Sequence, residues 1–360
     1  MNVLTVYNDS FIKTIARIAP GTELREGLER IVRGHTGALI VLGDDKTVHG
    51  ISSGGFAINT EFSATRLREL AKMDGAIICD KDATMLLNAG VQLLPDPSIE
   101  THESGTRHRT AERVAVQTGF PVITVSSSMS MISVYVDKIR YTVEDTQVLM
   151  SRANQAIQTL ESYTNRLEQI LQSLSSLEIE AGVTLRDVAA TLQRMEMVRR
   201  ISAEVSFYVL ELGTSGRLIA LQLEELTRPE MPGADVVLQD YLSLQEMQDE
   251  SFAQDALFQL QNLDDKDIVD LSIIAQTVGL PGSDLDAALY PRGFRLLSSV
   301  KSMPATVVER LVEQFDGLQG LMAANLEDLK AVEGVGESRA RTIRESLSRM
   351  AESSLLERFM

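Results

Sequence analysis

Positive charge is concentrated in one short stretch of the chain, ESGTRHRTAER at residues 103–113. The capping and turn residues at 104–106 indicate that a helix begins here. Free N–H groups at that helix start, together with cationic and hydroxyl side chains, would form a cradle for a polyphosphate. The side chains of this cradle would be those of Thr106, Arg107, Arg109 and Thr110. Taken alone, the stretch is more economically interpreted as a solvated charge cluster, because such clusters are common.

A second stretch, MDGAIICDKD at residues 73–82, places carboxylates on both sides of a short apolar run. Asp74-Gly75 is a common turn dipeptide, so a structural turn is its default interpretation when it stands alone. A carboxylate at the edge of a buried strand also suits a divalent metal or a reacting hydroxyl, and Gly75 would let a ligand approach the backbone. Asp80 and Asp82 are further carboxylates. Strand alternation or a loop could point either side chain toward solvent.

The chain as a whole is acidic, which limits where an anion can bind. Its 360 residues carry a formal net charge of −17, so non-specific adhesion to nucleic acid or to an anionic membrane is disfavoured. Any anion site must therefore be local. No G-x-x-x-x-G-K-[ST] loop occurs, which excludes a P-loop nucleotide enzyme. The remaining prediction is an unusual nucleotide site, built from an Asp-Gly-Ala turn and an Arg-His-Arg helix start.

Thiol and zinc chemistry are not indicated. The single cysteine, Cys79, lies in an apolar run without a partner cysteine, so we interpret it as a small buried hydrophobe rather than a catalytic thiol. The histidines have no metal-ligand spacing; they are His35, His49, His102 and His108. The chain shows no N-terminal signal and no apolar run near the roughly 18 residues of a membrane span, so we expect a cytoplasmic protein.

The pattern of apolar residues and of turn residues predicts three regions. Residues 1–143 alternate short apolar runs with helical periodicity, which favours an α+β (mixed α/β) domain around one mixed sheet. Residues 144–290 keep apolar residues three and four apart for many turns and predict a helical bundle or spine, most simply a structural connector. Residues 291–360 begin at a proline- and glycine-marked boundary and predict an all-α domain of two helix–turn–helix units.

Within the first region, the expected strands are GALIVLG (37–43), GAIIC (75–79), PVITVSS (121–127) and MISVYV (131–136). A leading helix, a second helix capped by Thr22, and helices over 63–73 and 108–118 are expected between and before them.

The last unit, residues 325–350, contains a glycine hairpin between two short helices. Its pattern L-x-x-V-x-G-V-G-x-x-x-A-x-x-I resembles the helix-hairpin-helix modules that bind DNA without sequence specificity. Backbone N–H groups of such a hairpin can face one phosphate, although the same motif also serves for packing alone. Candidate DNA contacts are Lys330, Gly334, Val335, Gly336, Arg339, Arg341 and Arg344. Because residues 301–360 are slightly acidic, we expect modest, salt-sensitive affinity.

These motifs occur in an order that resembles one family. Asp74-Gly75-Ala76 and Arg107-His108-Arg109 lie about thirty residues apart, and a helical spine and a terminal helix-hairpin-helix follow. This arrangement resembles the bacterial DNA integrity scanning proteins, which are diadenylate cyclases that condense two ATP into cyclic di-AMP. The resemblance extends over essentially the whole chain. It includes the stretches APGT (19–22), GGFAINT (54–60), ELAKMDGAII (69–78), TRHRTAER (106–113), ANQAIQTLE (153–161) and PRGFRLL (291–297).

The resemblance implies roles for individual residues. Asp74 would bind a catalytic Mg²⁺ or Mn²⁺ and help to activate the attacking ribose 3′-hydroxyl. Gly75, Ala76 and Leu93 would line the nucleotide, with Leu93 beside the adenine. The triphosphate would be held by Thr106, Arg107, His108, Arg109 and Thr110, with Arg107 and Arg109 counted as catalytic. Where relatives often carry basic residues, this chain has SSSMS at 126–130.

The resemblance also implies a homo-octamer whose cyclase domains face one another, and association with the nucleoid through branched or recombination-intermediate DNA. The product has two equivalent 3′–5′ linkages, which two facing copies of one site would supply. The rival interpretation is a catalytically silent, oligomeric DNA-binding scaffold, against which the intact Asp74, Arg107 and Arg109 argue.

Overall fold

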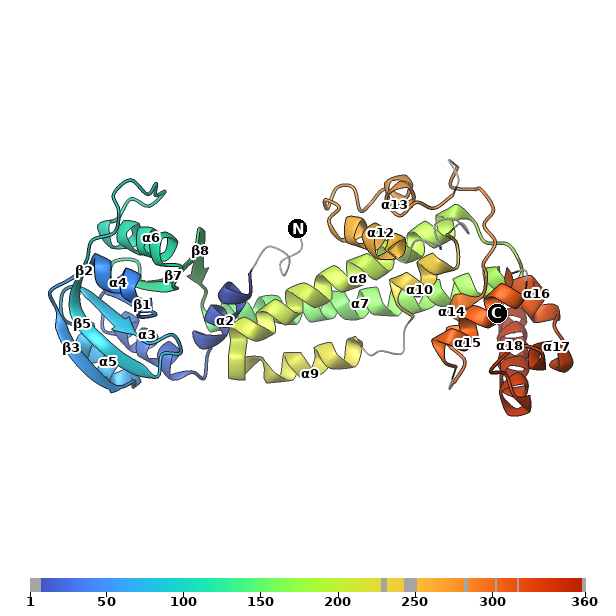
Figure 1. Cartoon of the computed structure of the whole chain (residues 1–360), viewed down its shortest axis with the longest axis horizontal. Helices are drawn as coiled ribbons and strands as arrows, with labels where there is room; N and C mark the ends of the chain where they lie inside the picture. Colours follow the sequence, from blue (N-terminus) through green and yellow to red (C-terminus); the bar gives the residue numbers. More distant parts are fainter. Residues whose placement is uncertain are drawn as a thin grey trace. The chain divides into compact units, whose positions relative to one another are not determined.

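The computed structural model describes residues 8–227, 232–242, 251–281, 284–301, 303–315 and 317–357 (Figure 1). The chain divides into two compact units. The sheet unit contains the described residues up to Gln155 together with Val205–Gln222, and the helical unit contains Ala156–Glu204 and the described residues from Leu223 onward. The strands end at Val143 and α7 begins at Thr146, and packing adds Val205–Gln222 to the sheet unit. The division into three domains stays a prediction.

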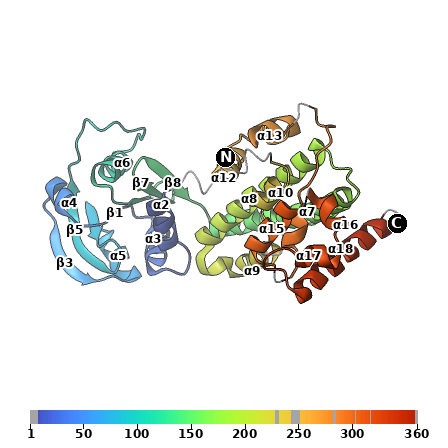
Figure 2. The same ribbon diagram turned by 45° about the vertical axis from the view of Figure 1, so that its right-hand side comes forward.

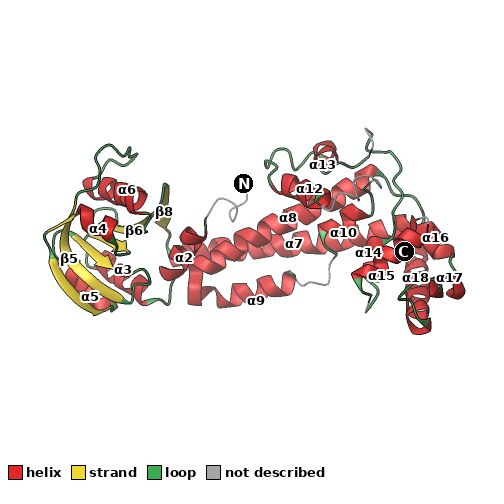
Figure 3. Cartoon of the chain, in the orientation of Figure 1, coloured by secondary structure: helices red, strands yellow, loops and turns green. Residues whose placement is uncertain are grey.

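The sheet unit is built on one mixed sheet (Figure 3). Its strand order is β2-β5-β4-β1-β6-β7-β8, and β3 also pairs with β5. The β1–β4 pair is parallel, and the other pairs are antiparallel. The strands are β1 Ala38–Leu42, β2 Ser52–Ser53, β3 Phe56–Glu61, β4 Ala76–Cys79, β5 Met85–Leu93, β6 Val122–Ser126, β7 Met131–Val136 and β8 Ile139–Val143. All four expected strands are confirmed, and the expectation of a mixed sheet is confirmed with them.

Helices cover both faces of this sheet. They are α2 Asp9–Arg17, α3 Glu23–Arg33, α4 Lys46–Ile51, α5 Ala64–Leu70 and α6 Thr106–Thr118. Because side chains alternate along a strand, Ile40 and Leu42 of β1 enter one core with α2, α3 and α5. Leu39 and Val41 enter the other core with α4 and α6. The predicted cap is confirmed, since the Thr22 hydroxyl accepts from the N–H of Arg25 at the start of α3.

The buried core accounts for Cys79. It is fully buried in the α2–α3–α5 core, and burial raises the pKa of its thiol to about 12. A thiol in this state is protonated and inert at neutral pH.

The segment Val205–Gln222 returns to the sheet unit and packs against its first helix. Phe207 stacks on Phe11, with ring centroids 6.4 Å apart, and meets Tyr141 edge-on at 6.3 Å. The turn within this segment approaches the backbone before α3 closely, because a Cβ on Gly213 (φ +49°) would lie 2.4 Å from the Pro20 carbonyl oxygen. Only glycine fits such a position. The unit therefore depends on residues far beyond its strands.

The helical unit contains two long helices and several short ones, and α7 and α8 each also contribute residues to the sheet unit. Its first group comprises α7 Thr146–Ile179, α8 Leu185–Leu212, α10 Ala234–Gln239, α12 Phe252–Gln261 and α13 Leu271–Thr277. Between α8 and α10 lie η1 Gly213–Gly216, which belongs to the sheet unit, and α9 Arg217–Leu226, whose first part also does. The C-terminal group comprises α14 Phe294–Ser298, α15 Ala305–Gln314, α16 Gly317–Ala323, α17 Leu326–Lys330 and α18 Glu337–Glu357. The expected helical middle and all-α C-terminal region are confirmed, and two hairpins, α15–α16 and α17–α18, match the two predicted helix–turn–helix units (Figure 2).

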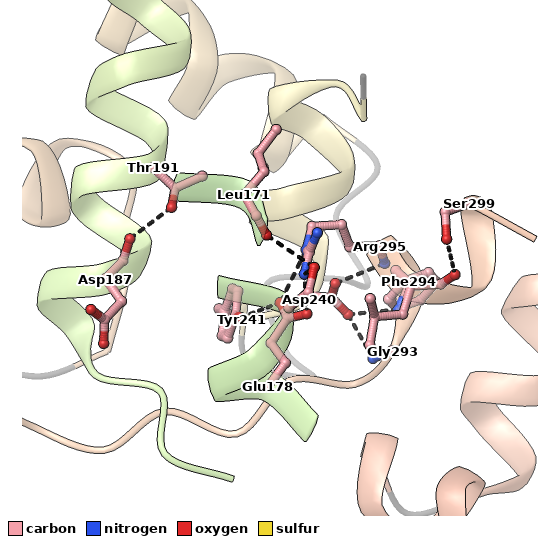
Figure 4. A network of polar contacts seen from close by, with 12 residues as sticks. Leu171, Glu178, Asp187, Thr191, Asp240, Tyr241, Gly293, Phe294, Arg295 and Ser299 are labelled. Carbon is pink, nitrogen blue, oxygen red and sulfur yellow. Dashed lines mark hydrogen bonds and ion pairs between the residues drawn. The ribbon is translucent and has the colours of Figure 1, made fainter. Parts of the chain in front are cut away.

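A buried polar network joins α7, α10 and α14 inside this unit (Figure 4). Glu178 forms an ion pair with Arg295 and accepts a 2.6 Å hydrogen bond from the Tyr241 hydroxyl. Asp240 accepts from the backbone N–H groups of Gly293, Phe294 and Arg295 at 2.6–2.8 Å. Burial, and then the charge of Glu178, raise the pKa of Asp240, while the three N–H donors oppose them. The stretch PRGFRLL, predicted only as a boundary, is thus anchored by two buried carboxylates.

We predict that Arg295→Met destabilises the helical unit by roughly 3–5 kcal/mol, because it leaves the carboxylate of Glu178 buried without its cation. Arg186→Met removes one member of the exposed pair Arg186–Asp286 and should cost about 1 kcal/mol or less. Denaturant unfolding of the two full-length variants, followed by circular dichroism, measures the difference. Equal losses of unfolding free energy in both variants would contradict the stabilising role of the buried Arg295–Glu178 pair.

Candidate active site

The carboxylate of Asp74 lies at the end of the sheet where β4 begins. Gly75 has φ +101°, and a Cβ there would lie 2.6 Å from the backbone carbon of Gly90 on β5. The backbone can therefore pass this close to β5 only with glycine at position 75. Asp74 is exposed, and among the described residues nothing donates a hydrogen bond or forms an ion pair to its carboxylate. The predicted turn is present, and it presents a free carboxylate.

Two exposed apolar side chains flank Gly90 beside this turn. A Cβ on Gly90 would lie 3.6 Å from a ring carbon of Phe56 and 3.7 Å from the terminal methyl of Met73. Phe56 is 67% exposed and Met73 is 40% exposed. Sequence reasoning missed both as site residues, although Phe56 lies in the quoted stretch GGFAINT. An aromatic ring and a thioether next to a carboxylate provide apolar surface for a flat ring.

The Arg-His-Arg segment forms the first turn of α6. The helix begins at Thr106, earlier than the periodicity over 108–118 predicted, and its N-cap is Gly105. Because Gly105 makes no side-chain capping hydrogen bond, the first N–H groups of the helix remain available to a ligand. Arg107 and Arg109 lie two positions apart on this helix and point in different directions around its axis. One ligand reaches both only at the helix end.

Arg107 reaches the same edge of the sheet as Asp74. A Cβ on Gly37 would lie 2.2 Å from an Nη atom of Arg107, and that Nη lies 3.5 Å from the Val125 carbonyl oxygen. The guanidinium thus lies where β1 begins and β6 ends. β1 and β4 are adjacent parallel strands, paired Ile40 to Ile77, so both begin at this edge. The structure therefore brings Asp74 and Arg107 to neighbouring strand ends.

Arg109 differs from the other arginines of the sheet unit's first part. Between residues 8 and 155, every other arginine has a hydrogen bond or ion pair to a described oxygen, the weakest being that of Arg107. No such contact engages the exposed Arg109 guanidinium. Thr106 is also exposed, and Thr110 is half-buried one turn further along. An unpaired cation at an uncapped helix start is suited to an anion.

His108 points into the sheet unit rather than outward with the arginines. Its Nδ1 lies 2.8 Å from the Tyr135 hydroxyl and 3.2 Å from the Thr124 hydroxyl. Tyr135 donates to Glu103 at 2.9 Å, and Glu103 also pairs with Arg140 at 2.9 Å. Since the Tyr135 proton is given to Glu103, His108 donates through Nδ1, and its Nε2 remains for a ligand. Tyr135 and Glu103 thus hold the His108 ring in its orientation, and the sequence analysis did not identify either residue.

The third arginine of the charged stretch is structural. Arg113 donates to the carbonyl oxygens of Ile99 and Pro97 at 2.8 and 3.0 Å. Glu112 accepts from Thr101 and from the N–H of His102, and Gln117 accepts from the N–H of Asp96. Side chains of α6 thus fasten the loop that precedes their own helix, which fixes where the Arg-His-Arg turn lies.

Other predicted residues of this domain have structural surroundings. Ala76 is fully buried in β4, and Leu93 is packed in the α4–α6 core, whereas the next residue, Leu94, is 58% exposed. Asp80 accepts from Thr84 and the N–H of Met85 and closes the turn after β4, and Asp82 pairs with Arg17. These two carboxylates follow the C-terminal end of β4, opposite Asp74. The SSSMS stretch forms the β6–β7 turn, which follows the end of β6 that Arg107 contacts.

The described residues contain no group of three or more histidine, cysteine, aspartate or glutamate side chains that could hold a metal ion. A divalent ion at Asp74 would therefore take its remaining ligands from phosphate oxygens and water. This donor set fits Mg²⁺ and similar ions, which keep several waters and bind through one or two carboxylates and substrate phosphates.

The C-terminal hairpin has the geometry expected of a helix-hairpin-helix. Asn325 and Asp328 form a capping box at α17. Gly334 has φ +89°, and its carbonyl oxygen accepts from Arg339. Val335 is buried, whereas a Cβ on Gly336 would meet nothing within 4 Å. The backbone at Gly336 is therefore open to an approaching ligand.

The cationic candidates of this hairpin all have contacts within the chain. Lys330 pairs with Glu327 at 3.1 Å, Arg341 pairs with Glu337 at 2.6 Å, and both pairs are at the surface. Arg344 donates to the carbonyl oxygen of Ala324, beyond the end of α16. Surface pairs of this kind exchange readily with water or phosphate, whereas the Arg344 contact also holds the two hairpins together.

Comparisons with known proteins match the chain in three segments. Family models match residues 25–139 (DisA bacterial checkpoint controller nucleotide-binding), 143–285 (DisA bacterial checkpoint controller linker region) and 317–346 (Helix-hairpin-helix motif). Proteins named DNA integrity scanning protein DisA are similar over nearly their full length. The protein from Kineococcus radiotolerans is 56% identical over 97% of both chains, and that from Streptomyces coelicolor is 53% identical over 96% of this chain and 93% of its own. None of the helices in the described ranges is long and apolar enough to cross a membrane.

The contacts of His108 allow a prediction about the pKa of its imidazole. Burial, the first cause, lowers the pKa of His108 below its ordinary value, and Arg140 and Arg107 lower it further, while Glu103 raises it. Glu103→Gln removes the one favourable charge, so the midpoint should fall further. NMR titration of the imidazole in wild type and variant measures both values. A midpoint that is unchanged or higher in the variant would contradict the proposed contact.

Proposed function

The chain belongs to the family of the DNA integrity scanning protein DisA, and from this premise we propose that it is a diadenylate cyclase. It condenses two ATP into cyclic di-AMP and releases two pyrophosphates. The observation that carries the proposal is the free carboxylate of Asp74 at the same sheet edge as Arg107, with the unpaired Arg109 on the same helix turn. These residues supply a carboxylate that can accept a proton and cations that can bind phosphate, in a chain of net charge −17.

The reaction is a nucleotidyl transfer at the α-phosphate. The ribose 3′-oxygen of one ATP attacks the α-phosphorus of the other, a new P–O bond forms, and the bond to the bridging oxygen of the β-phosphate breaks. The proton of the 3′-hydroxyl leaves toward Asp74, and pyrophosphate leaves with the bonding electrons. Arg107, Arg109 and the N–H groups of α6 neutralise the phosphate charge that moves onto pyrophosphate.

A bound Mg²⁺ or Mn²⁺ would be held by Asp74 and by phosphate oxygens, and it would polarise the α-phosphate and lower the pKa of the 3′-hydroxyl. Phe56 and Met73 would offer apolar surface to the adenine. The roles of Gly75, Ala76, Leu93, Thr106, His108 and Thr110 as nucleotide contacts are part of the same proposal. For Ala76 and Leu93 these contacts would come from the backbone, because both side chains are buried.

Two copies must cooperate, because the product contains two equivalent 3′–5′ linkages. Each site would hold one ATP and present its 3′-hydroxyl to the other's α-phosphate. We propose that this pairing occurs within a homo-octamer, and that the C-terminal hairpins bind DNA, including branched or recombination-intermediate forms, and so couple synthesis to DNA structure. DNA binding would place the protein at the nucleoid.

We predict that Asp74→Asn abolishes cyclic di-AMP synthesis and that Arg109→Ala lowers the rate by roughly 10²–10³-fold, because a cation facing developing charge is lost. Arg33→Ala, which removes an exposed arginine paired with Glu29, is the matched control and should retain the rate. Chromatographic quantification of product from ATP with Mg²⁺ or Mn²⁺ is the measurement, with oligomer size checked in each variant. Full activity in Asp74→Asn would remove that residue from the proposed site.

A second prediction separates DNA binding from folding in the hairpin. A methyl group on Gly336 meets nothing within 4 Å, and Gly336 is not among the positive-φ glycines. Gly336→Ala should therefore leave thermal stability unchanged, yet weaken binding to branched DNA because the methyl would stand where a phosphate approaches the backbone. Fluorescence anisotropy at several salt concentrations measures the affinity.

Arg341→Gln provides an independent variant, because it removes a surface cation and should reduce both affinity and its salt dependence. Basal synthesis should be preserved in both variants. DNA affinity equal to wild type in Gly336→Ala and Arg341→Gln would overturn the assignment of this hairpin as the DNA contact.

A further inference from the structure

The helical unit contains a cavity that the proposed activity does not use. Its volume is about 490 Å³, and its walls come from α7, from the segment after α14 and from α18. Ser175 and Ile179 line it from α7, and Lys301 closes it after α14. Ser346, Arg349 and Met350 line it from α18. A volume of this size lies within the range of about 300–1,000 Å³ that small-molecule sites occupy.

The charge of this cavity is opposite to that of the chain. Lys301 and Arg349 line it, and no aspartate or glutamate does. Lys301 has no hydrogen bond or ion pair among the described residues, and Arg349 contacts only neutral oxygens, the Glu345 carbonyl and the Ser346 hydroxyl, both at 3.3 Å. In the nearby hairpins, by contrast, Lys330 and Arg341 are paired with carboxylates. Two unneutralised cations facing one cavity favour an anionic ligand.

Two apolar side chains, those of Ile179 and Met350, also line the cavity. Both side chains are half-buried, so they are partly open to an occupant. A methionine thioether adapts to flat rings, and an aliphatic wall accepts the face of a base. A ligand that matches both unneutralised cations and apolar surface, in this volume, is a phosphate attached to a planar ring.

We propose that this cavity binds a free nucleotide, with its phosphates at Lys301 and Arg349 and its base against Ile179 and Met350. The site is distinct from the proposed cyclase site, since all its lining residues belong to the helical unit, and the inference does not rest on the proposed activity. A bound nucleotide would contact α7 and α18 at once. It would thus tie the second helix of the DNA-binding hairpin to a helix that also contributes residues to the sheet unit.

The test is hydrogen–deuterium exchange of the full-length protein with ADP, because exchange reports the location of binding as well as its strength. ADP should slow exchange in peptides covering 342–353 and 172–179. Adenosine, which lacks phosphate, should give no protection there at the same concentration. This comparison uses wild-type protein and does not depend on how any variant folds.

Lys301→Gln and Arg349→Gln should each raise the ADP concentration needed for half-maximal protection by at least about tenfold, because each removes a charge-assisted contact to phosphate. Lys266→Gln changes an exposed lysine of the same unit outside the cavity and should have no effect. Protection near residues 105–110 is read separately and reports the proposed cyclase site.

Three results would overturn the proposal: no protection of 342–353 by ADP, equal protection by adenosine, or unchanged half-maximal concentrations in both glutamine variants. A short duplex DNA forms a further arm. Protection of 342–353 by DNA but not by ADP would also overturn the free-nucleotide proposal, and it would identify the phosphates of the DNA backbone as the ligand.

Discussion

Local charge balance is the constraint on which this protein's chemistry depends. The proposed reaction requires each copy of a chain of net charge −17 to receive a triphosphate, so the cations that bind it have to be kept away from the many available carboxylates. In the sheet unit, the location of each arginine determines whether it meets a carboxylate. Between residues 8 and 155 its other arginines are bound along helix surfaces or to loop carbonyls, whereas Arg109 remains free at the uncapped start of α6 and Arg107 rests against the backbone at Gly37. The same separation recurs at Lys301 and Arg349 in the helical unit.

Close backbone contacts determine where these groups lie. The approach of Gly75 to Gly90 fixes Asp74 at the end of β4, and the space at Gly37 admits the guanidinium of Arg107. The loop before α6 is fastened by Glu112, Arg113 and Gln117. Because none of these contacts uses the side chain of Asp74 or Arg109, a substitution at either residue should remove chemistry without rearranging the sheet.

Local sequence pattern was enough to predict part of this arrangement. Short apolar runs predicted β1, β4, β6 and β7, and turn residues before Arg107 predicted the start of α6, because strand burial and helix capping are local properties. β2, β3, β5 and β8 were not predicted. β5 mixes buried and half-exposed residues and contains Gly90 at φ +67°, and β3 is mostly exposed, so neither gives a clear apolar run. Contacts between distant residues were also beyond local pattern, including Phe207 with Phe11, Arg295 with Glu178, and the Glu103–Tyr135–His108 chain.

The most direct test of the central claim is the stoichiometry of products from the full-length wild-type protein. Purified protein is incubated with ATP and Mg²⁺ or Mn²⁺, and cyclic di-AMP and pyrophosphate are quantified in the same samples. The account predicts two pyrophosphates for each cyclic di-AMP, with no accumulation of ADP. Folded, oligomeric protein that releases pyrophosphate without the cyclic dinucleotide, or that leaves ATP unchanged, would contradict it.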